Sequence, residues 1–144
     1  AKRLRTVENF RGYIHLKTIP DAAPEIIAEA GLYADRLSIN VELPTDRSVQ
    51  AFAPEKNPAT IRAAMGNIRG LRRASQDKSH TGKRPLLFAP AGKSIQLIVA
   101  ADGATDATIL TRSTALCDNY KLRSDSYSAF LPLPDRTATR TPIT

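Results

Sequence analysis

The sequence predicts an α/β fold, specifically an incomplete (β/α) barrel of about four parallel strands that alternate with helices. Strand-like segments are separated by segments whose apolar residues recur at helical spacing. Crossovers through helices place successive strands parallel, with right-handed connections as a rule. The first two strands also carry polar residues along one face, whereas the middle strands of a doubly wound sheet are covered on both faces. A complete eight-unit barrel needs about 250 residues, so this chain of 144 residues supplies about half of one.

The first two predicted strands show the polar face most clearly. Residues 12–18 and 37–43 alternate polar and apolar side chains, and successive strand residues point to opposite faces of a sheet. The polar positions are Tyr13, His15 and Lys17 in the first strand and Ser38, Asn40 and Glu42 in the second. We interpret this face as a wet, functional interior, because parallel strands are normally apolar on both sides.

Cap residues mark where the helices between the strands begin. Asp21 precedes a helix expected to open near Pro24. Asn57 and Pro58 have the form of an N-cap and a first helical position, and apolar residues at helical spacing extend that helix to about Ala74. The stretch before Asn57, residues 43–56, is predicted to be a loop.

The second half of the chain repeats the pattern. A third strand is expected over residues 94–100, with Gln96 on its more polar face. Thr105 or Asp106 caps a following helix, and a fourth strand covers about residues 122–130. Ser126 and Ser128 share one face of that strand.

Length and composition predict one domain, over residues 1–130. The Pro- and Thr-rich tail, residues 131–144, is predicted to be disordered, and residues 75–85 to form an exposed loop. No apolar run approaches a membrane span, so we expect no membrane contact and a cytoplasmic location. The single cysteine, Cys117, excludes an intramolecular disulfide and a multi-cysteine metal site within this chain, and no metal site is predicted.

The formal net charge of +7 is concentrated between residues 69 and 84. The candidate nucleic-acid contacts there are Arg69, Arg72, Arg73, Lys83 and Arg84. Such a cluster could neutralise nucleic-acid phosphates, but it lacks the interleaved aromatic residues that stack on bases. A solvated helix end that runs into a loop is the alternative interpretation.

Four segments together resemble the radical SAM superfamily, and within it a family of proteins assigned to DNA modification or repair. They are RGYIHLKTIPDAAPEIIAEAGLYADRLSINVELPT, AFAPEK, FAPAGKSIQLIVAADGATDATIL and SYSAFLPLP, in the family's order and spacing over roughly residues 10–134. The resemblance implies that the four predicted strands of this chain are the third to sixth strands of a partial (β/α) barrel. It also implies S-adenosylmethionine and a 4Fe-4S cluster as cofactors, with DNA as the partner.

The CxxxCxxC motif that holds the cluster in this superfamily is absent from the chain. Cys117 is expected to be an ordinary helix residue. The resemblance therefore implies that upstream sequence supplies the cysteines and the remainder of the barrel, and that this chain alone cannot bind the cluster and is inactive. An incomplete barrel also has exposed sheet edges through which it could associate.

The resemblance assigns roles to residues on the polar faces. Candidate contacts to S-adenosylmethionine are Asn40, Glu42, Ser38, Gln96, Tyr127 and Ser128, and candidate substrate contacts are His15 and Lys17. Structural hydrogen bonding is the alternative role for these side chains. Two positions depart from the family pattern, since Ala100 stands where a glycine is expected and Ser126 where a tyrosine is expected.

Two classes of function follow from the sequence. The first is a segment of a radical SAM enzyme that acts on nucleic acid. The second is a non-enzymatic, basic α/β module that binds nucleic acid or a protein partner.

Overall fold

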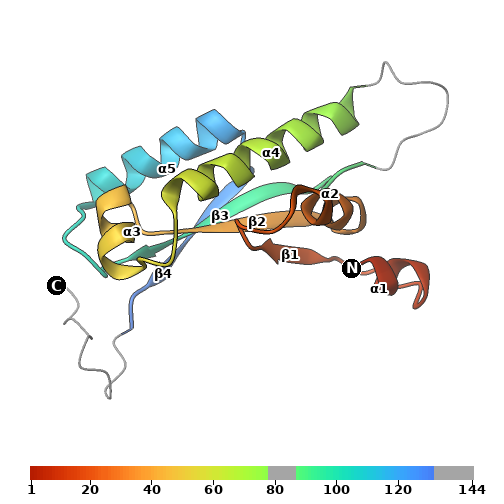
Figure 1. Cartoon of the computed structure of the whole chain (residues 1–144), viewed down its shortest axis with the longest axis horizontal. Coiled ribbons are helices and arrows are strands. Elements are labelled where there is room, and N and C mark those ends of the chain that lie inside the picture. Colours follow the sequence, from red (N-terminus) through yellow and green to blue (C-terminus); the bar gives the residue numbers. More distant parts are fainter. Residues whose placement is uncertain (78–86, 132–144) are drawn as a thin grey trace.

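A computed structural model describes residues 1–77 and 87–131. Within these residues the fold is α/β, with a sheet of four parallel strands that alternate with helices and do not close into a barrel (Figure 1). The strands are β1 (His15–Thr18), β2 (Arg36–Glu42), β3 (Gly92–Val99) and β4 (Ser124–Ala129). The helices are α1 (Lys2–Thr6), α2 (Pro24–Tyr33), α3 (Asp46–Phe52), α4 (Pro58–Gln76) and α5 (Asp106–Tyr120). The predicted fold class is confirmed.

The order of the strands in the sheet leaves one face without helices. The strands lie in the order β1-β2-β3-β4, which is also their order along the chain. Each crossover therefore moves in the same direction, and right-handed crossovers that all move one way place their helices on one face. Helices α4 and α5 lie together on one side of the strands in Figure 1. This arrangement explains how a parallel sheet can keep a polar face.

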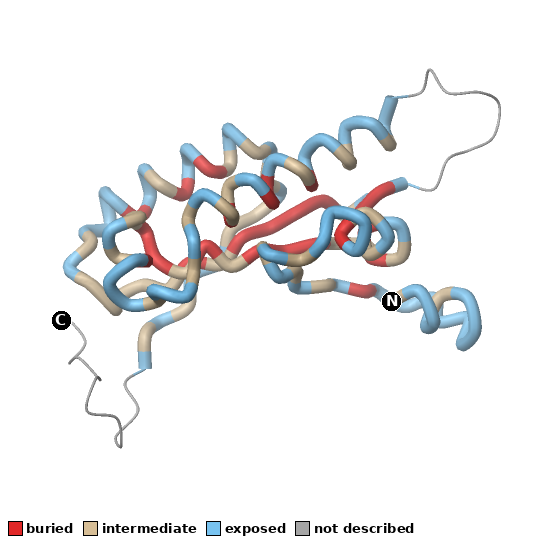
Figure 2. Tube along the Cα trace, in the orientation of Figure 1, coloured by how far each residue is buried: buried red, intermediate tan, exposed pale blue. Residues whose placement is uncertain are grey.

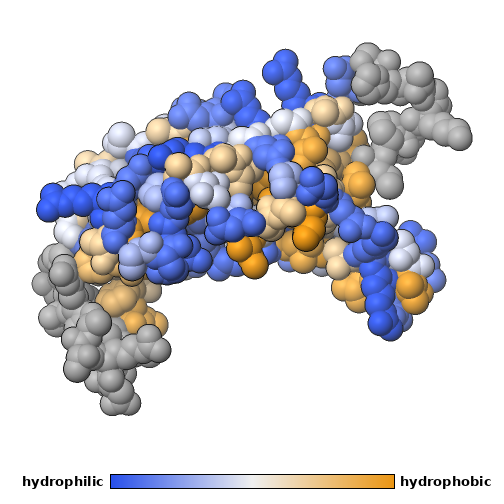
Figure 3. Space-filling view, in the orientation of Figure 1, coloured by the Kyte–Doolittle hydropathy of each residue, from blue (hydrophilic) through white to orange (hydrophobic). Residues whose placement is uncertain are grey.

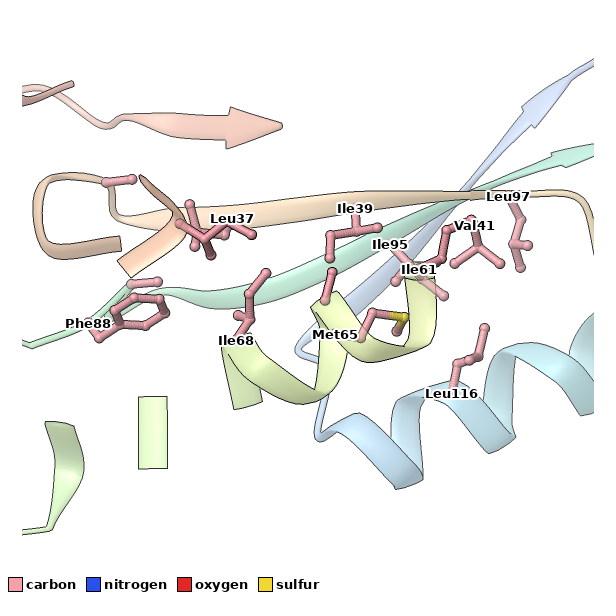
Figure 4. Close-up of a cluster of buried hydrophobic side chains, with 14 of the residues drawn as sticks. Leu37, Ile39, Val41, Ile61, Met65, Ile68, Phe88, Ile95, Leu97 and Leu116 are labelled. Atoms are coloured by element: carbon pink, nitrogen blue, oxygen red, sulfur yellow. The ribbon is translucent and has the colours of Figure 1, made fainter. Parts of the chain in front are cut away.

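The hydrophobic core lies between the sheet and its helices. Figure 4 shows apolar side chains of β2 and β3 facing those of α4 and α5. The labelled members are Leu37, Ile39, Val41, Ile61, Met65, Ile68, Phe88, Ile95, Leu97 and Leu116, each no more than 3% exposed. Burial follows the same pattern in Figure 2, where β2 and β3 are largely buried and the outward sides of the helices are exposed. Hydrophilic side chains cover the outward side of α4 and α5 in Figure 3. Burial of these side chains stabilises the fold by about 1.5–3 kcal/mol for each large one.

The predicted helix caps are confirmed at two of three positions. The Asn57 side chain accepts a hydrogen bond from Ala59 N at the start of α4, and Thr105 accepts one from Thr108 N at the start of α5. The prediction that Asp21 caps α2 is wrong, because Ala23 is the N-cap of this helix and no side chain caps it. Pro24 at the first helical position fixes the backbone there without a cap, because its ring holds φ near the helical value.

Two short helices were not predicted from the sequence. Helix α3 lies within the stretch predicted to be a loop, where Thr45 caps it through Ser48 N and Val49 is buried. Helix α1 is held by Arg5, whose Nη2 lies 2.7 Å from Asp35 Oδ2. The same oxygen accepts a hydrogen bond of 2.7 Å from Ile14 N, so one carboxylate links α1 to the entry of β1.

Gly31 allows α2 to approach the segment before β3. A Cβ atom at this position would overlap the ring of Phe88, which is 3% exposed. The backbone N–H of Ala89 donates to Gly31 O at 2.7 Å. The absence of a side chain at Gly31 therefore lets an aromatic ring close this end of the core.

The element boundaries differ from the predictions by a few residues. Strand β1 begins at His15 rather than at residue 12, and α4 continues to Gln76 rather than to Ala74. Most of the predicted loop, residues 78–86, and nearly all of the predicted tail, residues 132–144, lie outside the described residues. Within the described part of the chain, no helix is both long enough and apolar enough to span a membrane.

Candidate ligand-binding face of the sheet

The register of the strands brings the predicted polar residues side by side. One row across the sheet is Lys17, Ser38, Ser94 and Ser124, and the next is Asn40, Gln96 and Ser126. Paired residues of parallel strands point to the same face, so these side chains share the face that lacks helices. The alternation predicted from the sequence is therefore continuous across the four strands. We call this surface the polar face.

A hollow of about 180 Å³ lies on the polar face. Its lining comes from all four strands and consists of His15, Lys17, Ser38, Ser94, Ile95, Gln96 and Ser126. His15 and Lys17 lie on the exposed strand β1 and form one side of the hollow, whereas Ser38 and Ser94 are more than 90% buried at its floor. The lining offers hydroxyl, amide, imidazole and ammonium groups, which can donate to or accept from a polar ligand.

Hydrogen bonds satisfy some polar groups of this face, but two buried atoms, Asn40 Oδ1 and Arg36 Nε, have no partner among the described residues. Gln96 Nε2 donates to Ser128 Oγ, and Ser126 Oγ donates to Ile95 O at 3.1 Å. Asn40 Oδ1 is buried and has no hydrogen-bond partner. A buried acceptor without a partner costs about 1–3 kcal/mol, so Asn40, which lies beside Gln96 but does not line the hollow, is a candidate acceptor for a ligand donor.

The backbone is strained where β2 ends. Glu42 has φ of 71°, and Leu43 N donates to Val41 O across it at 3.1 Å. This is a γ-turn with a positive φ at its central residue, a rare and strained form. The register between β2 and β3 shifts at the same place, between Asn40 and Glu42. Strain of this kind persists where the surrounding structure enforces it, and it clusters at functional sites.

The end of β3 shows a related feature. Ala100 follows the strand directly and has φ of 62°, in the left-handed region that favours glycine. The carboxyl ends of β2 and β3 therefore both carry left-handed residues, Glu42 and Ala100, at the same edge of the sheet.

Arg36 belongs to the polar face and was missed in the sequence. Its Nη1 donates to Ser124 Oγ at 3.4 Å, which spans the face from β2 to β4, and its Nε is buried without a partner. The signal was present, since Arg36 stands two residues before Ser38 and continues the same alternation. It was overlooked because the strand was predicted to begin at Leu37.

Tyr127 is separated from the other candidate cofactor residues. Its hydroxyl donates to Asp125 Oδ2 at 2.6 Å and lies 2.9 Å from Ser113 Oγ, on the side of the sheet that α5 covers. The hydrogen bond to Asp125 raises the pKa of the Tyr127 hydroxyl, and the hydrogen bonds from Ser113 and Tyr127 lower the pKa of the Asp125 carboxyl. Ser128, one residue on, points to the polar face beside Gln96.

The basic candidates do not join the polar face. Arg69, Arg72 and Arg73 lie in the last turns of α4, on the helix side of the sheet. Arg69 Nη1 donates to Asn119 O and so ties α4 to the end of α5. The remaining two basic candidates, Lys83 and Arg84, lie outside the described residues.

A larger, open hollow of about 600 Å³ lies between the segment after β2 and helix α5. Its lining includes the carboxylate Asp46, which already forms ion pairs with Arg62 at 2.8 Å and with Arg112 at 2.9 Å. The other lining residues are mainly threonine, alanine and proline. Arg112 also lines this hollow, and its buried Nε has no hydrogen-bond partner.

The metal-ligating side chains do not cluster. Among the described residues, no group of three or more His, Cys, Asp and Glu side chains is placed to hold a metal ion. Cys117 is a half-buried free thiol on α5, and burial raises its pKa. A thiol with a raised pKa is a poorer nucleophile and ligand at neutral pH, since the thiolate is the reactive form.

Comparison with models of known protein families gave no match, and comparison with curated proteins gave none either.

Proposed function

We propose that this chain is a segment of a radical SAM enzyme that modifies or repairs nucleic acid, and that its polar face forms part of the S-adenosylmethionine site. The observation that supports this most is the unsatisfied Asn40 Oδ1, which lies beside Gln96 toward the carboxyl ends of the strands. Ligands of (β/α) barrels bind at that end of the strands. The left-handed residues Glu42 and Ala100 at the same edge give further support.

The residues present fit part of S-adenosylmethionine. Asn40 Oδ1 can accept a hydrogen bond from a ribose hydroxyl or an amino group, and a carboxylate such as Glu42 can accept from ribose hydroxyls. The hollow of about 180 Å³ is smaller than the roughly 300–1,000 Å³ of a site that encloses a drug-sized ligand. In this proposal the rest of the site, with the remainder of the barrel, comes from upstream sequence.

The residues present do not fit a 4Fe-4S cluster. Three thiolates are needed to leave one iron open to the cofactor, and the chain contains one cysteine, Cys117, on α5. When bound in the complete enzyme, the cluster would supply the electron that cleaves S-adenosylmethionine. We therefore propose that this chain alone binds the organic cofactor weakly and is catalytically inactive. A cytoplasmic location is part of the same proposal.

Substrate recognition is assigned to β1 in this proposal. His15 and Lys17 line the exposed side of the hollow, where a nucleic-acid phosphate or base could approach the cofactor. Lys17 would contact phosphate as a point charge, and His15 could move a proton near neutral pH.

Calorimetric titration of the chain with S-adenosylmethionine tests the proposal. We expect weak binding that falls roughly tenfold in Asn40→Leu, which removes the unsatisfied acceptor and a ligand hydrogen bond. Asn67→Leu on α4 is the matched control and should leave the affinity within about twofold. Absence of binding, or equal binding by both variants, would contradict the proposed site.

The basic module is the second candidate. Arg69 and Arg73 are exposed on the last turns of α4, and neither has an ion pair to a described residue. Binding of single-stranded DNA by this surface should weaken steeply with salt and lose about one unit of salt slope for each arginine replaced. Binding that is absent or independent of salt would exclude it.

A further inference from the structure

Two cations, Lys93 on β3 and Arg72 on α4, lie near each other on the core-facing sides of their elements. The buried stripe of α4 runs through Ile61, Met65 and Ile68, and the next position at that spacing is Arg72. On β3, the helix-facing positions are Lys93, Ile95 and Leu97. Lys93 is therefore the first residue of a strand face whose next two residues are apolar. Lys93 is only 4% exposed.

The described residues give neither cation an acidic partner. No acidic side chain of a described residue pairs with Lys93 or Arg72, and Arg72 Nε is buried without a hydrogen-bond partner. Burial and the nearby charges of Arg72 and Arg69 lower the pKa of Lys93 to about 8. Buried charges are normally paired with an opposite charge, and the described residues provide no anion at this end of the core.

We propose that Lys93, Arg72 and Arg69 form a binding site for a phosphate group. This inference is independent of the S-adenosylmethionine proposal, because the site lies on the helix side and at the amino end of β3. Arg69 and Arg72 are three residues apart and so share one side of α4, above Lys93. Two arginine forks and a lysine ammonium match the charge and the acceptor oxygens of a phosphate dianion better than those of a single carboxylate.

Calorimetric titration with inorganic phosphate, at constant ionic strength set by chloride, tests the site. Lys93→Met keeps the length of the side chain and removes its charge, and Arg72→Gln keeps a donor and removes the charge. Each should weaken phosphate binding roughly tenfold or more. Arg47→Gln removes the same charge from an exposed position on α3, outside the basic cluster, and should change the affinity less than about twofold.

A parallel titration with a single-stranded oligodeoxynucleotide identifies the source of the phosphate. If the nucleic-acid backbone occupies the site, Lys93→Met and Arg72→Gln will weaken oligonucleotide binding more than Arg47→Gln does. If the ligand is a free phosphate, Lys93→Met and Arg72→Gln will weaken the binding of inorganic phosphate but not the binding of the oligonucleotide. The proposal is overturned if neither ligand binds, or if all three variants bind phosphate as the unaltered chain does.

Discussion

Replacement of Lys93 by methionine should stabilise the protein, because it removes a charged side chain from a buried position. The pKa of Lys93 is lowered from the ordinary value of 10.5 to about 8, chiefly by burial and then by Arg72 and Arg69. One pKa unit corresponds to about 1.4 kcal/mol, so the charged form is disfavoured in the folded state by about 3 kcal/mol. Methionine fills the same volume without this cost, and about 3 kcal/mol is the upper limit of the expected gain at neutral pH.

The gain should depend on pH in a direction fixed by the lowered pKa. Below pH 8, Lys93 is charged in both the folded and the unfolded chain, and the folded state carries the full penalty. As pH rises from about 8 to 10.5, the folded lysine is neutral while the unfolded one remains charged, and the penalty declines. The stability difference between Lys93→Met and the unaltered chain should therefore shrink across this window.

Urea unfolding at a series of pH values, in buffers free of phosphate, measures this difference. The urea concentration at the unfolding midpoint should be higher for Lys93→Met than for the unaltered chain, while the slope of the unfolding free energy against urea concentration stays the same. Lys56→Met, between α3 and α4, is the control and should change stability by no more than about 0.5 kcal/mol at neutral pH. Destabilisation by Lys93→Met at neutral pH, or a gain that does not vary between pH 8 and 10.5, would refute the reasoning.

Three further substitutions test other features of the fold and the site. Ala100→Gly removes the backbone strain of an alanine with left-handed φ, and we expect urea unfolding to show about 0.5–1 kcal/mol of stabilisation. The control Ala101→Gly should destabilise the protein, because it only adds conformational freedom to the unfolded chain. Gly31→Ala places a methyl group against the ring of Phe88 and should lower stability by about 1–3 kcal/mol, with loss of the near-ultraviolet circular dichroism of the aromatic core. Asp125→Asn should remove a pH-dependent part of stability that the unaltered chain holds above the ordinary pKa of 3.8 and loses as pH falls below it, because two hydroxyl donors lower the pKa of this carboxyl.

The fold was predictable because its signals are local. Alternation in residues 12–18 and 37–43, and the capping residues Asn57 and Thr105, are properties of a few neighbouring residues, and the structure confirms the strands and helices that they predicted. Helix α3 escaped prediction because it is short and buries a single side chain, Val49, so it has too few apolar residues to show a helical period.

The candidate site was predictable in its composition and only partly in its geometry. Ser38, Asn40 and Gln96 could be placed on polar faces from alternation alone, but their alignment in one surface depends on the register between strands. The hydrogen-bond contact of Tyr127 with Ser113 and the approach of Lys93 to Arg72 also depend on packing. These are contacts between residues far apart in the sequence, which no local pattern encodes.

The most direct test of the central claim is to locate S-adenosylmethionine on the chain by its effect on side-chain amide signals in nuclear magnetic resonance spectra. The polar face carries the amides of Asn40 and Gln96, whereas Asn67 and Asn119 lie on helices of the other side. Binding at the polar face predicts that the signals of Asn40 and Gln96 shift with added ligand and that those of Asn67 and Asn119 do not. Shifts confined to the helix amides, or no shifts at all, would contradict the claim that the bare polar face of this sheet is a ligand-binding surface.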